Sequence, residues 1–165
     1  MLHTLLSSVV LSAAVAADPV TVPDAAMLRY PDIGKNEIVF VFANNLWVVS
    51  KTGGVARPLT SAAGAEVMPR FSPDGTRIAF VGNYDGNRDI YVMPAGGGEP
   101  KRVTHHPAGE VVNEWTPDGD LLFTASGMEG IARAARLYRV KESGGLPQPL
   151  PVPYGTNGAI SPDGV

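Results

Sequence analysis

The sequence predicts an all-β protein, a β-propeller of about three four-stranded blades followed by the first strand of a fourth, which leaves the ring incomplete. A Ser/Thr-Pro-Asp-Gly turn occurs three times, at 72–75, 116–119 and 161–164, with its prolines 44 and 45 residues apart. A unit of about 40–45 residues with four strands is typical of a propeller blade. Glycine (19) and proline (15) make up about a fifth of the 165 residues. This composition favours many tight turns over long helices.

The first strand of each unit is predicted just before the turn. The stretches EVMPRFSPDG (66–75), EVVNEWTPDG (110–119) and GTNGAISPDG (155–164) align without gaps. A degenerate earlier copy, MLRYPDIG (27–34), is aligned with Pro31 over Pro73. In the turn, proline presets φ, the aspartate side chain bonds nearby backbone N–H groups, and glycine accepts positive φ. We therefore interpret Asp74, Asp118 and Asp163 as structural residues rather than a ring of acids.

The other three strands of each unit follow from recurring segments. An apolar run ends in Phe at 37–40, 77–80 and 120–123, and a segment with a central aromatic follows at 46–49, 90–93 and 137–140. Glycine turns at 52–54, 95–98 and 143–145 precede a short last segment. Blades are therefore expected at about 27–63, 64–108 and 109–154, and the next one begins at 155–165.

Three blades and one strand do not close a ring, because propellers have about 4–8 blades. The uncovered flanks would expose apolar surface and a strand edge to water. We expect the chain to be the front of a longer protein. The alternative is an open three-blade array that a partner covers.

Residues 1–17 are interpreted as a signal peptide, which leaves 18–165 as the partial propeller. Their apolar run, from Leu5 to Ala17, is too short to span a bilayer, which takes about 20 residues. The A-x-A pattern at 14–16 fits a cleavage site, although only the amino terminus and His3 supply an n-region. The sequence therefore predicts an exported, periplasmic or secreted protein with no membrane span after signal removal. The alternative is a buried or frayed apolar terminus.

Two of the units resemble a known family more specifically than the repeat does. The first unit, MLRYPDIGKNEIVFVFANNLWVVSKTGGVARPLTS, is similar to the first blade of the N-terminal six-bladed propeller of the tricorn protease family. The third unit shares with that family a long link, GMEGIARAA (127–135), between its second and third strands. The resemblance covers about 27–165.

The resemblance implies a large serine peptidase that acts on oligopeptides and a propeller that guides or gates substrate, with homo-oligomers when full length. No catalytic residue is carried over, because the catalytic region of that family lies beyond these blades. Two alternatives stay open: a non-enzymatic periplasmic Tol-type propeller that binds proteins, and the propeller of a prolyl-oligopeptidase-like hydrolase. The archaeal prototype works inside the cell, so a cytoplasmic location is the alternative to export.

Other chemistry is weakly indicated, and we expect no cofactor, metal or catalytic residue in this chain. The net charge of −3 without a basic patch argues against nucleic acid. His105 and His106 supply two ligands where zinc needs three or four. Asp85, Asn87 and Asp89 have the spacing of a calcium loop, but Ile90 replaces its required glycine. Both segments, and the AGGGEPK turn, are interpreted as strand connections.

The one candidate binding site is the irregular link of the third unit. It carries Met128, Glu129, Arg133 and Arg136. Long loops on a rigid scaffold are where binding residues gather, so we predict that these side chains contact peptides or protein partners. The alternative is a solvated surface loop.

Overall fold

The computed structural model describes residues 27–129 and 134–161, so the predicted signal peptide, Arg133 and Asp163 lie outside the described residues. The described strands are β1 (Arg29–Ile33), β2 (Glu37–Phe42), β3 (Asn45–Ser50), β4 (Arg57–Pro58), β5 (Ala65–Phe71), β6 (Arg77–Asn83), β7 (Asp89–Pro94), β8 (Lys101–Arg102), β9 (Glu110–Trp115), β10 (Asp120–Ser126), β11 (Ala135–Lys141) and β12 (Gln148–Pro149). This part of the chain contains no helix that is long and apolar enough to cross a membrane.

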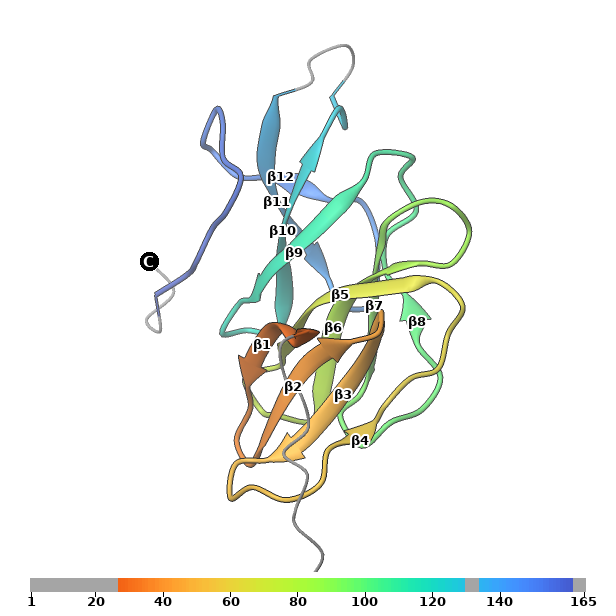
Figure 1. The fold of residues 1–165 in the computed structure, drawn as a ribbon. Helices are drawn as coiled ribbons and strands as arrows, with labels where there is room; N and C mark the ends of the chain where they lie inside the picture. Colours follow the sequence, from red (N-terminus) through yellow and green to blue (C-terminus); the bar gives the residue numbers. More distant parts are fainter. Residues whose placement is uncertain (1–26, 130–133, 162–165) are drawn as a thin grey trace, which may run out of the picture.

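The strands form three four-stranded sheets, each an antiparallel meander in chain order: β1–β4, β5–β8 and β9–β12. Figure 1 shows the three sheets fanned one behind another, in the arrangement of successive propeller blades. The first strands lie next to one another, with β5 in contact with both β1 and β9. The predicted all-β fold with an incomplete ring is therefore confirmed.

The Pro-Asp-Gly turns join the first strand of the second and third sheets to the second strand, as predicted. Gly75 and Gly119 have φ values of 73° and 90°. A side chain at such φ would be strained, so glycine lets the strand reverse within a tight turn. The fourth strands are short, as expected, with two residues each.

The alignment of the first unit was wrong by four residues. Ile33 pairs with Ile38 as Phe71 pairs with Ile78, so Pro31 occupies the place of Pro69 rather than Pro73. The residues that precede these prolines, Tyr30 and Met68, have φ values of 52° and 55°, and each lies at a register shift between first and second strands. A β-bulge is therefore the shared feature of the two strands.

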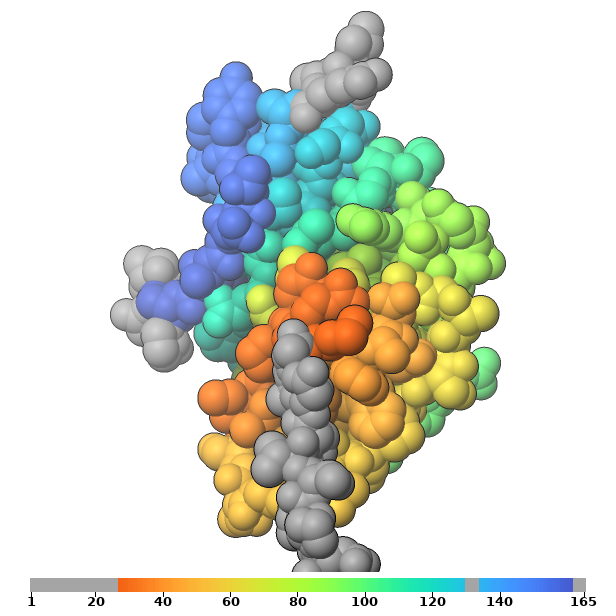
Figure 2. Space-filling view, viewed as in Figure 1, coloured from red at the N-terminus to blue at the C-terminus, as the bar shows by residue number. Residues whose placement is uncertain are grey.

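The core lies between the sheets, in two clusters. Two clusters form because the side chains of a strand such as β6 alternate between the two faces of its sheet. Ile78 and Phe80 belong to the cluster shared with the first sheet, and Ala79 and Val81 to the cluster shared with the third. Each sheet thus buries one face on each neighbour. In Figure 2 the surfaces of the sheets follow one another in chain order, from orange through yellow-green to cyan.

The segment 155–161 lies against the third sheet where the first strand of a further sheet would lie. Gly155 N donates to Ala135 O at 3.0 Å, as Glu66 N donates to Asn44 O and Glu110 N to Arg88 O. A Cβ at Gly158 would lie 2.9 Å from Leu122 Cδ2, so the close approach of the segment requires glycine there. The repeat therefore continues into this segment in its backbone contacts.

Candidate functional site

The aspartates of the two described Pro-Asp-Gly turns, Asp74 and Asp118, accept hydrogen bonds within their own turns. Asp74 accepts hydrogen bonds from Ser72 Oγ (2.5 Å), Thr76 N (3.0 Å) and Thr76 Oγ1 (2.8 Å). These donors lower the pKa of Asp74 to about 2. Asp118 accepts from Thr116 Oγ1 at 2.5 Å, and this bond lowers its pKa as well. The predicted structural role of these two residues is confirmed.

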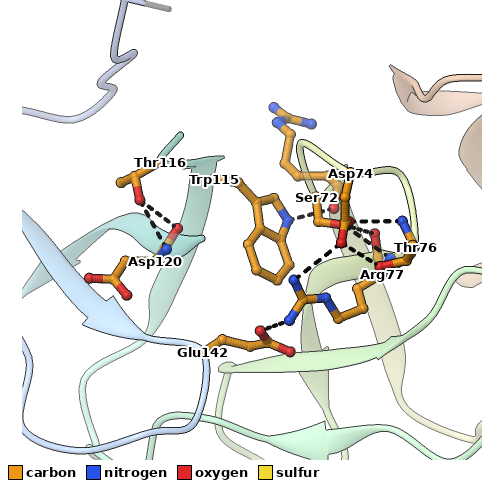
Figure 3. Close-up of polar contacts among 9 residues, drawn as sticks. Ser72, Asp74, Thr76, Arg77, Trp115, Thr116, Asp120 and Glu142 are labelled. Atoms are coloured by element: carbon orange, nitrogen blue, oxygen red, sulfur yellow. Dashed lines mark hydrogen bonds and ion pairs between the residues drawn. The ribbon is translucent and has the colours of Figure 1, made fainter. Parts of the chain in front are cut away.

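Arg77 connects the second sheet to the third (Figure 3). Its guanidinium is ion-paired with Glu142, in the turn that follows β11, and lies 3.7 Å from Asp74 Oδ2. Its Cζ also lies 5.3 Å from the centre of the Trp115 ring, within reach of a cation–π interaction. Arg77 thus contacts the first strand of the third sheet and the turn after β11.

The Trp115 indole adds a hydrogen bond between the same two sheets. Its Nε1 donates to Arg70 O at 2.9 Å, and Arg70 Nε donates to Asn113 O at 2.8 Å. These bonds run in both directions between β5 and β9. The cluster in Figure 3 therefore cross-links two neighbouring sheets, and within it Arg77 is paired with both Asp74 and Glu142.

The residues considered for metal binding take part in connections between strands. Asp89 is buried and bound by Arg102 Nη2 at 2.6 Å, and Asp85 lies 3.7 Å from the same guanidinium. Asn87 Nδ2 donates to Asp89 Oδ1 and to His106 O. Within the described residues, no group of three or more His, Asp or Glu side chains is placed to hold a metal ion.

The predicted binding loop is only partly described, because Arg133 falls outside. Glu129 and Arg136, seven residues apart, form an ion pair. Met128 is partly buried and packs against the core cluster of the second and third sheets. The structure therefore brings Glu129 and Arg136 together and turns Met128 inward, and contact of this loop with peptides or proteins stays a prediction.

Two buried glutamates were missed by sequence reasoning. Glu66 is the second residue of β5 and Glu110 the first residue of β9, and both are fully buried. Each accepts a short hydrogen bond from a threonine hydroxyl of the preceding sheet, Thr60 for Glu66 and Thr104 for Glu110. The recurring Thr and Glu, 44 residues apart in successive units, were the signal that could have found them.

These threonine–glutamate pairs hold neighbouring sheets together. Thr60 Oγ1 accepts from Leu46 N and Thr104 Oγ1 from Ile90 N, both at 2.9 Å, so each hydroxyl bridges a third strand to the glutamate of the next sheet. No such pair joins the third sheet to the described segment that follows it, because Gly155 occupies the position of the glutamate.

The Glu110 carboxyl is electrostatically unusual. Burial raises its pKa to about 7, against the lowering effect of the Thr104 hydroxyl. Its Oε1 has no hydrogen-bond partner among the described residues. The side chain lines a cavity of about 360 Å³ between the second and third sheets, together with Met128 and Glu129 of the predicted loop. A buried group with a perturbed pKa in a cavity marks a candidate binding site.

Comparison with known proteins relates the chain to one family. The family model described as "Tricorn protease N-terminal beta propeller domain" matches residues 25–165. Tricorn protease homolog 1 of Streptomyces coelicolor is 31% identical over 144 residues, which are 86% of this chain and 13% of the relative.

Two solved structures have the same arrangement of sheets. The crystal structure of the tricorn protease matches with a TM-score of 0.71 and 29% identity, over 84% of this chain and 14% of that one. TolB from Acinetobacter baumannii matches with a TM-score of 0.69 and 25% identity, over 83% of this chain and 36% of that one. The chain thus spans only a small part of each of these proteins.

Proposed function

Because this chain belongs to the family of tricorn protease N-terminal β-propeller domains, we propose that it is part of the first propeller of a tricorn-like serine peptidase. In this role it guides oligopeptides and scaffolds the enzyme, and it supplies no catalytic residue. The observation that carries the proposal is the family match over 25–165, which includes all three sheets.

The contacts between the sheets support a scaffold. Arg77, Trp115 and the two threonine–glutamate pairs join neighbouring sheets by paired charges and hydrogen bonds. The polar side chains of these clusters are thereby held in fixed positions. Cross-linked sheets of this kind form a rigid scaffold, and the loops on such a scaffold could contact a peptide that passes through the propeller.

The test separates binding from cleavage. The purified 165-residue chain is incubated with a library of short peptides, and mass spectrometry follows both the peptides retained with the protein and the products formed. We expect retention without cleavage. Cleavage that a Ser→Ala change in this chain abolishes would refute the non-catalytic role, and the absence of any retained peptide would refute the guiding role.

A second candidate function is that of a non-enzymatic propeller that binds proteins. The observation that favours it is the similarity to TolB, whose structure matches over 83% of this chain. Reading the gene beyond the codon for Val165 distinguishes the two. A frame that continues through further units of about 44 residues into a catalytic region supports the peptidase, and a frame that ends when the ring closes supports the binding module.

The proposed location is outside the cytoplasm, periplasmic or secreted. It rests on the apolar run and the A-x-A pattern of residues 1–17. N-terminal sequencing of the protein made by its own host tests it. A mature chain that starts near Asp18 in the exported fraction supports export, and an intact Met1 in the cytoplasmic fraction refutes it.

A further inference from the structure

The two threonine–glutamate contacts between neighbouring sheets are built alike, except for one missing side chain. Between the first and second sheets, Tyr84 donates its hydroxyl hydrogen to Glu66 Oε1 at 2.5 Å. Its ring lies edge-on to Tyr91, with the ring centres 4.7 Å apart. Burial and this bond raise the pKa of Tyr84, so the phenol stays protonated and remains a donor. The chain itself thus supplies the partner of the Glu66 carboxylate.

We call the group Thr60, Glu66, Tyr84 and Tyr91 the first frame. A second frame, which has the same residue types at most of these positions, lies between the second and third sheets. Glu110 corresponds to Glu66, since each lies five residues before the end of its strand, β9 for Glu110 and β5 for Glu66. Tyr138 stands for Tyr91, because it pairs with Phe123 as Tyr91 pairs with Phe80. The pair formed by Thr104 and Glu110 repeats the threonine–glutamate bond as well.

The donor is missing from this second frame. Tyr84 directly follows β6, and the residue that directly follows β10 is Gly127. Glu110 Oε1 accordingly has no partner in the described part of the chain, although Glu110 is fully buried. A buried acceptor left unpaired costs free energy that a donor would recover.

A cavity of about 360 Å³ borders the Glu110 carboxyl, and Gly127, at the position of the missing donor, lines a second cavity that also contacts Glu129 and Tyr138. The lining of the Glu110 cavity includes Thr104, Glu110, Met128, Tyr138, Leu146 and Pro147, whereas Tyr84 itself lines the corresponding cavity of the first frame. Its volume falls within the range of ligand pockets, about 300–1,000 Å³. Met128, Tyr138, Leu146 and Pro147 supply apolar or aromatic surface, His105 and His106 are polar, and Glu110 supplies the buried acceptor. Glu129 also lines the cavity, but it is paired with Arg136.

We propose that this cavity binds a tyrosine side chain of a peptide, with the phenol hydroxyl donating to Glu110 Oε1 and the ring packed against Tyr138. The bound tyrosine would take the place that Tyr84 fills in the first frame. A neutral phenol suits the site, because its ring would pack on Met128 and Tyr138 while its O–H would pair with Glu110 Oε1 once the side chains covering this buried atom move aside. The proposal rests on the comparison of the two frames and does not depend on the proposed function.

The first experiment uses the tyrosine side chain as a small molecule. Isothermal titration calorimetry of the 165-residue chain at pH 8 compares 4-methylphenol with toluene, which has the same ring and no donor. We expect 4-methylphenol to bind about tenfold or more tightly, since toluene leaves the acceptor unpaired. Equal affinities, or no saturable binding because water fills the cavity, would overturn the proposal.

Two variants locate the site. Glu110→Gln places an amide at the acceptor and is expected to remove most of the preference for the phenol, whereas Glu66→Gln, whose oxygen Tyr84 already occupies, should retain it. Because Leu146 is 87% exposed, Leu146→Asp should fold normally and weaken both probes several-fold. NOEs between 4-methylphenol and Met128 are expected in the wild-type chain. NOEs to Tyr84 instead would place the ligand between the first and second sheets and would refute the proposed site.

The last measurement distinguishes a peptide from a free phenol. Gly-Gly-Tyr-Gly-Gly and Gly-Gly-Phe-Gly-Gly, both capped at their ends, are titrated in the same way. We expect the tyrosine peptide to bind about tenfold more tightly than the phenylalanine peptide. Binding of 4-methylphenol without binding of the tyrosine peptide would show that the cavity accepts only small phenols, and would refute the peptide as occupant.

Discussion

Ionisation of Glu110 should make the protein less stable as the pH rises. Its pKa in the folded chain is about 7, against an ordinary value of 4.5, and burial is the main cause. The carboxyl of Asp89 raises this pKa further, whereas the Thr104 hydroxyl, the Ile90 backbone N–H and the Arg102 guanidinium lower it. A carboxyl whose pKa is raised by folding favours the folded state at low pH, where it is protonated.

The magnitude follows from the two pKa values. At about 1.4 kcal/mol per pKa unit, the difference between 4.5 and about 7 corresponds to about 3 kcal/mol. This stabilising contribution is fully present below pH 4.5 and is lost as the pH rises through 7. Between pH 5 and pH 8 the free energy of unfolding should fall by roughly 2–3 kcal/mol from this group alone.

Glu110→Gln tests this value, because glutamine does not ionise. Urea denaturation of wild type and variant is followed by tryptophan fluorescence at pH 5 and pH 8. The variant should lose most of the decline in unfolding free energy, while Glu99→Gln, at an exposed position, should keep the wild-type decline. Direct titration of the Glu110 side-chain carbon by NMR checks the pKa itself. A value near 4.5, or identical pH slopes in wild type and Glu110→Gln, would refute the reasoning.

Three further changes test other parts of the fold. Arg77→Met removes the ion pair and the cation–π contact with Trp115, and should lower the free energy of unfolding by about 1 kcal/mol in urea denaturation. Asp74→Asn should destabilise the chain at neutral pH, and its difference from wild type should shrink as the pH falls from the ordinary pKa of 3.8 through about 2, as thermal melts at several pH values would show. Gly158→Ala should push residues 155–161 off the third sheet, because the added Cβ would lie 2.9 Å from Leu122, and amide hydrogen exchange in that segment should become faster while exchange in β6 stays unchanged.

The sequence was sufficient for the fold class because the repeat carries its own turn chemistry. Proline, aspartate and glycine act within four residues, so their effect on the backbone does not depend on distant contacts. Gly75 and Asp74 accordingly behave in the structure as the sequence predicted. The first unit lacks this turn, and its register was misjudged for that reason. The bulge at Tyr30 depends on pairing with β2, which the sequence does not display.

Candidate sites were harder to predict, because they depend on which sheets meet. The sequence singled out Glu129 and Arg136 from loop length, and the structure pairs them with each other. It overlooked Glu110, whose unusual state arises from burial beneath a neighbouring sheet and from a donor that the second frame lacks. Neither burial nor a missing partner is visible in a single strand.

The sequence by itself therefore determined the repeat, the turns and the alternation of apolar residues, since each results from interactions within a few residues along the chain. Only the tertiary structure decided how the charged groups are used. Arg77 became a cross-link and Glu110 the wall of a cavity because packing brought residues of different sheets within hydrogen-bonding distance and excluded water from some of them.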